Sequence, residues 1–284
     1  MATRAPEVAI VGLGVIGGSV ALRLRERGTP VRAFTTSTVD RTLATQAGVP
    51  VAASLGEAVR DVGLVLLAVP LDAVAEVAGD VLRDAPAKAT ILHAGSLQRP
   101  AAVGVAADVT ARVIGTHPLA GSHRTGFHGA SSELFRGAVV FAERRAKPRQ
   151  RDDLELLWSL AGAGRIEYCD AETHDEAMAW MSHLPQLAST VLATTIAAAP
   201  LEPTGQLSLG PGARDVTRLA MSSLEMWRPI LDRAPPATIA ALRAYETRLA
   251  AVRKALEARD AAAVGAAWER ARRWRSAFDS GETS

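Results

Sequence analysis

The stretch VAIVGLGVIGGSVALRLRERG, residues 8–28, decides the fold. It opens with a short apolar run typical of a buried strand and closes with an amphipathic helical pattern that ends at Gly28. Between the two stands a turn carrying Gly12, Gly14 and Gly17 in the spacing Gly-x-Gly-x-x-Gly. The first glycine permits a tight turn, the second lets the backbone approach a pyrophosphate, and the third lets the helix pack closely on the strand. Strand, turn and helix together predict a dinucleotide-binding domain, with the phosphates at the helix N-terminus.

The second strand pattern, residues 30–35, leads into hydroxyl side chains, with Arg41 shortly after and Asp40 beside it. A domain specific for NAD usually carries an acid at this strand end, which accepts a hydrogen bond from the ribose 2′-hydroxyl. Hydroxyls and an arginine suit a 2′-phosphate better, so the sequence favours NADP over NAD. The predicted cofactor contacts are Gly12, Gly14, Ile16, Gly17, Thr35, Thr36, Ser37 and Arg41, with Val69 and Pro70 at the end of the third strand.

Further strand patterns at residues 63–70, 89–96 and 112–118 alternate with helical patterns. Strands that are apolar throughout and alternate with helices indicate a parallel sheet covered on both faces. The predicted fold class is therefore α/β, with an N-terminal Rossmann-type, mostly parallel sheet.

From Thr173 onward only helical periodicity is found. Thr173 and Glu176 are spaced as a capping box that would open a helix, and Asp260 is placed to cap the last one. The basic segment 143–151 is interpreted as a solvated loop. The long apolar stripes of the helical part exceed what so small a domain can cover, which predicts a homodimer through it. The predicted domains are a dinucleotide-binding domain, residues 1–172, and an all-helical substrate and dimerisation domain, residues 173–284.

The composition excludes several classes of protein. A formal net charge of +2 without a concentrated basic run argues against nucleic-acid binding. Cys169 is the only cysteine, so neither a disulfide nor a cysteine-based zinc site is expected. No signal peptide is recognised, and no apolar run reaches the roughly 18 residues of a membrane span. These observations predict a cytoplasmic protein without membrane contact.

The segment GTHPLAGSHRTGFHG, residues 115–129, holds His117, His123 and His128. No cysteine or acid accompanies them at ligand spacing, so a metal site is not expected. This segment resembles the His-Pro-Met-Ala-Gly motif of the prephenate and arogenate dehydrogenases. Two later segments resemble that family in the same order: MSHLPQ at residues 181–186 and RDVTRLA at 214–220. The resemblance runs over nearly the whole chain, most closely from residue 8 to 230.

The resemblance implies oxidation of a cyclohexadienol that carries a ring carboxylate. Hydride leaves the carbinol carbon for the nicotinamide, the hydroxyl loses its proton, CO2 departs and the ring becomes aromatic. His117 matches the family's catalytic histidine. An imidazole with a pKa near 6.5 is largely neutral at pH 7 and would titrate between about pH 6 and 7. Ser96 matches the serine that holds the same hydroxyl, and Arg218 matches the arginine that binds carboxylate. Arg214 is its nearby competitor, and His183 and Gln186 are candidate substrate contacts.

Two departures from the family pattern leave the substrate open. His93 stands where an aspartate is usual, and Gln186 stands where a second histidine is frequent. Glutamine keeps hydrogen bonding but carries no titratable charge. The small-molecule substrate could be prephenate, arogenate or 4-amino-4-deoxyprephenate.

Two other functions fit the architecture. A β-hydroxyacid dehydrogenase or imine reductase would usually take an acid–base lysine from the helical domain, where Lys254 is the only lysine. A non-catalytic dinucleotide-binding sensor would use the histidines and arginines for structure alone. Turnover of a prephenate-like substrate separates both from a dehydrogenase of the prephenate type.

Overall fold

The computed structural model describes residues 7–99, 104, 112–122, 124–199, 210–233 and 235–280, so His123 lies outside the described residues. Its centre is a seven-stranded sheet in the order β2-β1-β3-β4-β5-β6-β7. Every neighbouring pair is parallel except β5 with β6, which is antiparallel. The predicted mostly parallel sheet is confirmed. The strands are β1 Val8–Val11, β2 Val31–Phe34, β3 Leu64–Leu67, β4 Thr90–His93, β5 Val113–Pro118, β6 Val139–Glu143 and β7 Arg165–Cys169.

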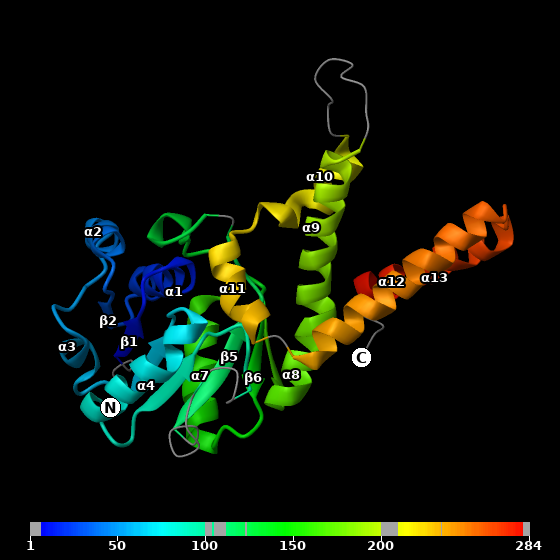
Figure 1. Ribbon diagram of the computed structural model, residues 1–284. Coiled ribbons are helices and arrows are strands. Elements are labelled where there is room, and N and C mark those ends of the chain that lie inside the picture. Colours follow the sequence, from blue (N-terminus) through cyan, green and yellow to red (C-terminus); the bar gives the residue numbers. More distant parts are fainter. Residues whose placement is uncertain are drawn as a thin grey trace.

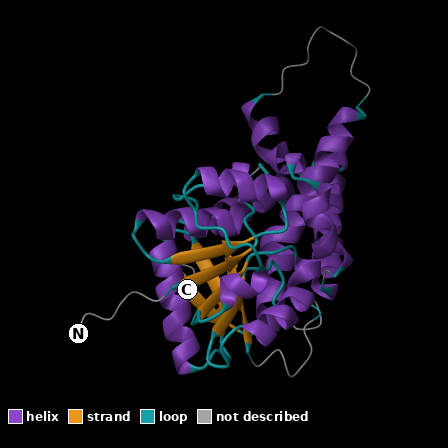
Figure 2. Ribbon diagram, turned by 90° about the vertical axis from the view of Figure 1, so that its left-hand side faces the viewer, coloured by secondary structure: helices purple, strands orange, loops and turns teal. Residues whose placement is uncertain are grey.

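Helices cover both faces of the sheet (Figure 2). Alternate residues of β1 enter opposite cores: Val8 and Ile10 pack toward α1 and α7, whereas Ala9 and Val11 pack toward α3 and α4. Burial of the central strands on both sides explains their uninterrupted apolar sequence. The helices and 3₁₀ turns (η) of this part are α1 Val15–Glu26, α2 Thr38–Gln46, α3 Leu55–Val59, η1 Leu71–Ala73, α4 Val74–Asp84, η2 Phe127–Gly129 and α7 Pro148–Ala161.

Every described element after β7 is helical, as the sequence predicts. Figure 1 shows α9 standing away from the sheet, and α12 and α13 forming a hairpin that projects to the side. The short α11 returns toward the sheet, where Ile230 packs against Leu71 and Leu97. The elements are α8 Ala171–Met178, the π-helical turn η3 Ala179–His183, α9 Leu184–Ala197, α10 Pro211–Thr217, η4 Arg218–Met221, α11 Leu224–Asp232, α12 Pro236–Glu257 and α13 Ala261–Ser280.

Two local predictions are wrong and one is confirmed. Helix α8 begins at Ala171 with Asp170 as its N-cap, so Thr173 and Glu176 lie inside the helix and form no capping box. The solvated-loop interpretation of residues 143–151 fails at both ends. Glu143 is the buried last residue of β6, and Pro148 opens α7, where the Gln150 side chain accepts from the Lys147 N–H. Asp260 caps α13 as predicted, since its Oδ1 accepts from the Ala263 N–H at 2.9 Å.

Candidate active site

The dinucleotide turn lies between the carboxyl end of β1 and the first turn of α1. Gly12 has a φ of +95°, and a Cβ there would stand 2.4 Å from the Ala68 carbonyl oxygen. A Cβ on Gly17 would stand 1.9 Å from the Gly12 carbonyl oxygen. A Cβ on Gly14 would meet no protein atom within 4 Å, although Gly14 has an ordinary φ of −70°. The protein itself therefore requires Gly12 and Gly17, whereas the open space at Gly14 fits a pyrophosphate lying against the backbone.

The end of β2 presents the hydroxyl side chains of Thr35, Thr36 and Ser37. Thr35 is buried and its Oγ1 accepts from the Ser37 N–H, while Thr36 is exposed. Asp40 lies close by, but its Oδ1 accepts from the Phe127 N–H at 2.7 Å. Arg41 donates through both Nη atoms to the carbonyls of Ala52 and Thr35, which fixes its guanidinium beside this strand end.

The loop after β5 wraps over the start of α1. A Cβ on Gly18 would stand 2.8 Å from the Phe127 ring, so glycine is needed for this contact. The Ser131 N–H donates to Ser19 Oγ at 2.9 Å. Together with the bond from Phe127 to Asp40, these contacts connect the strand that carries His117 to the dinucleotide turn.

The neighbouring strand ends supply the remaining candidates of the sheet. Ile16 packs against the core that β1 shares with α1 and α7. Val69 packs against the core on the opposite face of the sheet and against the cluster of Leu71, Leu97 and Ile230, and the exposed Pro70 follows it. Ser96 is half-buried in the turn after β4. That turn is braced by the Gln98 side chain, whose Nε2 donates to the Gly95 carbonyl at 2.9 Å.

His117, on β5, is the first member of a hydrogen-bonded series. Its Nδ1 lies 3.0 Å from His174 Nε2, and His174 Nδ1 lies 2.8 Å from Asp175 Oδ1. Asp175 also accepts from the backbone N–H groups of Gln98 and Arg99, and pairs with Arg99 Nε at 3.0 Å. His174 and Asp175 are fully buried on α8. Sequence reasoning missed both; the adjacent His-Asp pair just ahead of the Ser-His-Leu-Pro motif is the signal that could have found them.

The surroundings of His117 lower its basicity. Burial, followed by the proximity of His174, lowers the pKa of His117 to about 3, and His93 and His183 act in the same direction against Asp175. A pKa of about 3 lies well below the expected titration between about pH 6 and 7. His93 is an interior residue that accepts from the Gly95 N–H, and burial lowers its pKa to about 4.

The helical part brings the other candidates to one place. His183 is buried on η3 and hydrogen bonds through Nδ1 to Thr238 Oγ1 of α12 at 2.9 Å. Gln186, also buried, donates through Nε2 to the Leu219 carbonyl at 2.9 Å and so holds η4 against the start of α9. Arg218 is the first residue of η4 and is exposed, as is Arg214 on α10. Among the described residues, neither arginine has an ion-pair partner.

Two negative findings concern the described residues only. His128 is exposed on η2, and no three histidine, cysteine, aspartate or glutamate side chains of the described ranges gather closely enough to hold a metal ion. No helix in this described part of the chain is long and apolar enough to cross a membrane.

A dinucleotide turn and a neutral, oriented histidine at the same carboxyl edge of a parallel sheet define a nicotinamide-dependent dehydrogenase. Comparison with known families agrees. Residues 20–164 match the nucleotide-binding domain of prephenate dehydrogenase, and residues 170–267 match its dimerization domain. The chain belongs to the prephenate dehydrogenase family and is an oxidoreductase.

Individual relatives resemble the chain over most of their length. The cyclohexadienyl dehydrogenase of Zymomonas mobilis subsp. mobilis is 30% identical over 270 residues, which are 89% of this chain and 89% of that protein. The prephenate dehydrogenase of Lactococcus lactis subsp. cremoris is 26% identical over 281 residues, 96% of this chain and 77% of that protein. The solved prephenate dehydrogenase of A. aeolicus superposes with a TM-score of 0.83 at 22% identity, covering 97% of this chain and 99% of that one. The β-hydroxyacid dehydrogenase, imine reductase and sensor alternatives are not favoured.

Proposed function

We propose that the protein oxidatively decarboxylates a cyclohexadienol bearing a ring carboxylate, with His117 as the acid–base group. The observation that carries the proposal is the placement of His117 on β5, at the same carboxyl edge of the sheet as the dinucleotide turn and held by a buried partner. When bound, the nicotinamide supplies a hydride acceptor. His117 takes the proton of the substrate hydroxyl, and Ser96 hydrogen bonds the same oxygen.

The atoms and charges of the reaction balance with the substrate, the nicotinamide and His117 alone. Hydride leaves the carbinol carbon, and the hydroxyl proton passes to the free nitrogen of His117. The bond between the ring and its carboxylate breaks, CO2 departs, and the electron pair completes the aromatic ring. His117 then returns the proton to the phenolate oxygen. One group must accept and donate at the same oxygen, which a neutral imidazole does well.

The substrate is best determined with a panel. Prephenate and arogenate differ in the side chain, whereas 4-amino-4-deoxyprephenate carries an amine in place of the ring hydroxyl, so His117 would take the proton from nitrogen. Each of the three should be supplied with NADP and with NAD, and cofactor reduction followed. We expect turnover of at least one of them and tolerance of an amino group, because the buried amide of Gln186 brings no positive charge to repel an ammonium. Failure of all three with both cofactors would reject the proposal.

We propose that NADP is the preferred cofactor, with a lower KM than NAD. The support is the end of β2, where Thr35, Thr36 and Ser37 carry hydroxyls and the Asp40 carboxylate accepts through Oδ1 from the Phe127 N–H. Thr35→Asp should lower the preference for NADP over NAD by tenfold or more, about 1.4 kcal/mol, since a carboxylate accepts from a ribose hydroxyl and repels a phosphate. Thr35→Asn is the control, because asparagine has the shape of aspartate without its charge, and it should change the cofactor preference much less. A tenfold preference of the wild-type protein for NAD would contradict the proposal.

We propose that Arg218 binds a substrate carboxylate, as its place on the segment held by Gln186 supports. Hydrogen bonds to a charged group contribute about 1.5–3 kcal/mol, so Arg218→Ala should raise the substrate KM by roughly 10- to 150-fold with little change in kcat. Arg214→Ala removes a second exposed guanidinium, one helix earlier, and should change KM less than about threefold. If Arg214→Ala has the larger effect, the two assignments must be exchanged.

The low basicity of His117 gives a pH prediction. The base form is the active one, and a lowered pKa keeps that form populated to lower pH. The kcat/KM profile, which reports groups of the free enzyme, should therefore stay level from about pH 8 down to about pH 5. Initial rates at low substrate concentration measure it. A fall of kcat/KM at low pH with a midpoint between pH 6 and 7, absent in His117→Asn, would show that the site does not lower the pKa of His117.

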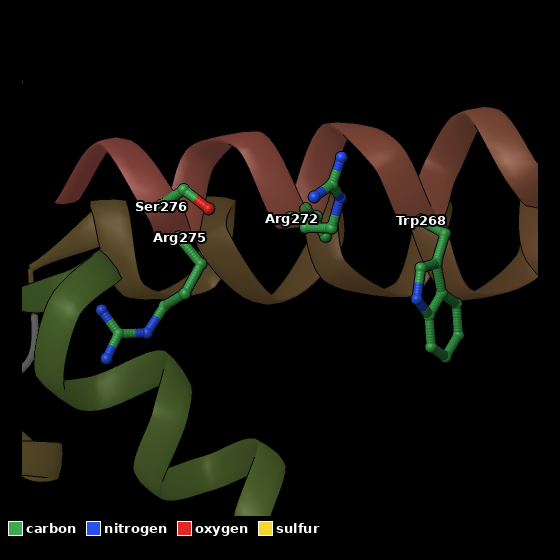
Figure 3. A pocket seen from close by; sticks show the side chains of 5 residues that line it. Trp268, Arg272, Arg275 and Ser276 are labelled. Carbon is green, nitrogen blue, oxygen red and sulfur yellow. The ribbon is translucent and has the colours of Figure 1, made fainter. Parts of the chain in front are cut away.

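We propose that the homodimer forms through the helical part. The pocket lined by Trp268, Arg272, Arg275 and Ser276 lies on α13, with the Trp268 ring directed outward (Figure 3). This helix packs chiefly on α12, so both helices present a long face to a partner. The exposed apolar side chains of the three long helices are Val191, Leu192, Ile239, Tyr245, Leu249, Leu256, Trp268 and Trp274.

A further inference from the structure

His174 and Asp175 take no part in the proposed reaction, yet they are the most deeply buried polar pair of the site. Asp175 is fully buried and accepts four hydrogen bonds, from the N–H groups of Gln98 and Arg99, from Arg99 Nε and from His174 Nδ1. Burial raises the pKa of Asp175, but the hydrogen bonds from His174, Gln98 and Arg99 outweigh it, so the pKa lies below its usual value. Asp175 is consequently a fixed carboxylate that can only accept.

This acceptor determines where the hydrogens of both imidazoles lie. Because Asp175 Oδ1 accepts, His174 Nδ1 must donate. The other ring nitrogen of a neutral His174, Nε2, is then an acceptor, so His117 Nδ1 must carry the hydrogen that joins them at 3.0 Å. The remaining nitrogen of His117, Nε2, is left bare.

We propose that His174 and Asp175 are positioning residues that hold His117 in the tautomer with its hydrogen on Nδ1. The tautomer itself does not depend on the proposed function; only its consequence for the reaction does. An Nε2 without hydrogen can accept the substrate proton, whereas the opposite tautomer would direct an N–H at the substrate hydroxyl. Phe141 packs edge-on against His174 with ring centroids 5.4 Å apart, which restrains the ring that transmits the orientation. In a hydrolase triad a carboxylate hydrogen bonds directly to the catalytic histidine and orients it. Here Asp175 would orient His117 in the same way, with the His174 ring between them.

Two substitutions at one position separate orientation from simple packing. In His174→Gln the amide can still donate to Asp175 through Nε2 and accept from His117 through Oε1. In His174→Leu both bonds are lost. We expect the leucine variant to lose about 10²–10⁴-fold in kcat, the range for losing a general base, and the glutamine variant to recover to within about tenfold of wild type.

The tautomer is measured directly on the free protein by ¹⁵N NMR of its histidine side chains at pH 7.5, with the His117 signals assigned from His117→Asn. We expect wild type and His174→Gln to show hydrogen on Nδ1 of His117, and His174→Leu to show it chiefly on Nε2, the tautomer that cannot accept the substrate proton. Hydrogen on Nε2 in the wild type, or a glutamine variant as inactive as the leucine variant, would overturn the proposal. Because the spectrum needs no substrate, it can succeed even if the proposed reaction fails.

Discussion

His117→Asn is expected to lower kcat by about 10²–10⁴-fold while changing KM little. Asparagine keeps a polar group near the substrate hydroxyl but cannot take its proton, and this interaction grows only as the proton leaves. Steady-state kinetics with the substrate identified by the panel measures both constants. His128→Asn is the matched control, since His128 is exposed on η2, and it should behave as wild type. A near-wild-type kcat in His117→Asn would remove the acid–base assignment.

Two glycines of one turn are expected to fail in different ways when changed to alanine. In Gly17→Ala the new Cβ would lie 1.9 Å from the Gly12 carbonyl oxygen and 2.9 Å from Ala68 Cβ. The turn must move, so the free energy of unfolding should fall by about 3 kcal/mol, the upper end for overpacking. In Gly14→Ala the Cβ enters open space, and we expect unfolding to change by less than about 1 kcal/mol.

The Gly14 variant should instead lose cofactor. Its Cβ occupies the space assigned to the pyrophosphate, so the Kd for the nicotinamide dinucleotide should rise tenfold or more. Denaturant unfolding and cofactor titration of both variants test the pair. A Gly14→Ala protein that binds cofactor as tightly as wild type would place the pyrophosphate elsewhere.

The turn and the sheet could be predicted because their determinants are local. The glycines at 12, 14 and 17 determine the conformation of one strand, one turn and one helix. The uninterrupted apolar sequence of the strands indicates that both faces of the sheet are buried. The start of α8 was misplaced for a related reason: two residues with capping-box spacing stand inside the helix, while Asp170 begins it without a side-chain cap. Local patterns thus located elements well and their ends less well.

The site could be predicted only in part, because its decisive contacts join distant segments. The bond between His117 and His174 spans 57 residues, and that between Asp40 and Phe127 spans 87. No periodicity reveals such pairs, so the sequence pointed to His117 and not to the residues that orient it. The pKa of His117 was likewise beyond the sequence, since its lowering comes from burial and from His174.

The central claim is that hydride transfer and loss of CO2 belong to one reaction at this site. A substrate of the panel labelled with ¹⁴C in its ring carboxylate tests it most directly, by comparing released label with reduced cofactor as the reaction proceeds. The account predicts one mole of labelled CO2 per mole of reduced cofactor, with both lost together in His117→Asn. Cofactor reduction without release of the label would contradict it, because the protein would then be a simple alcohol dehydrogenase.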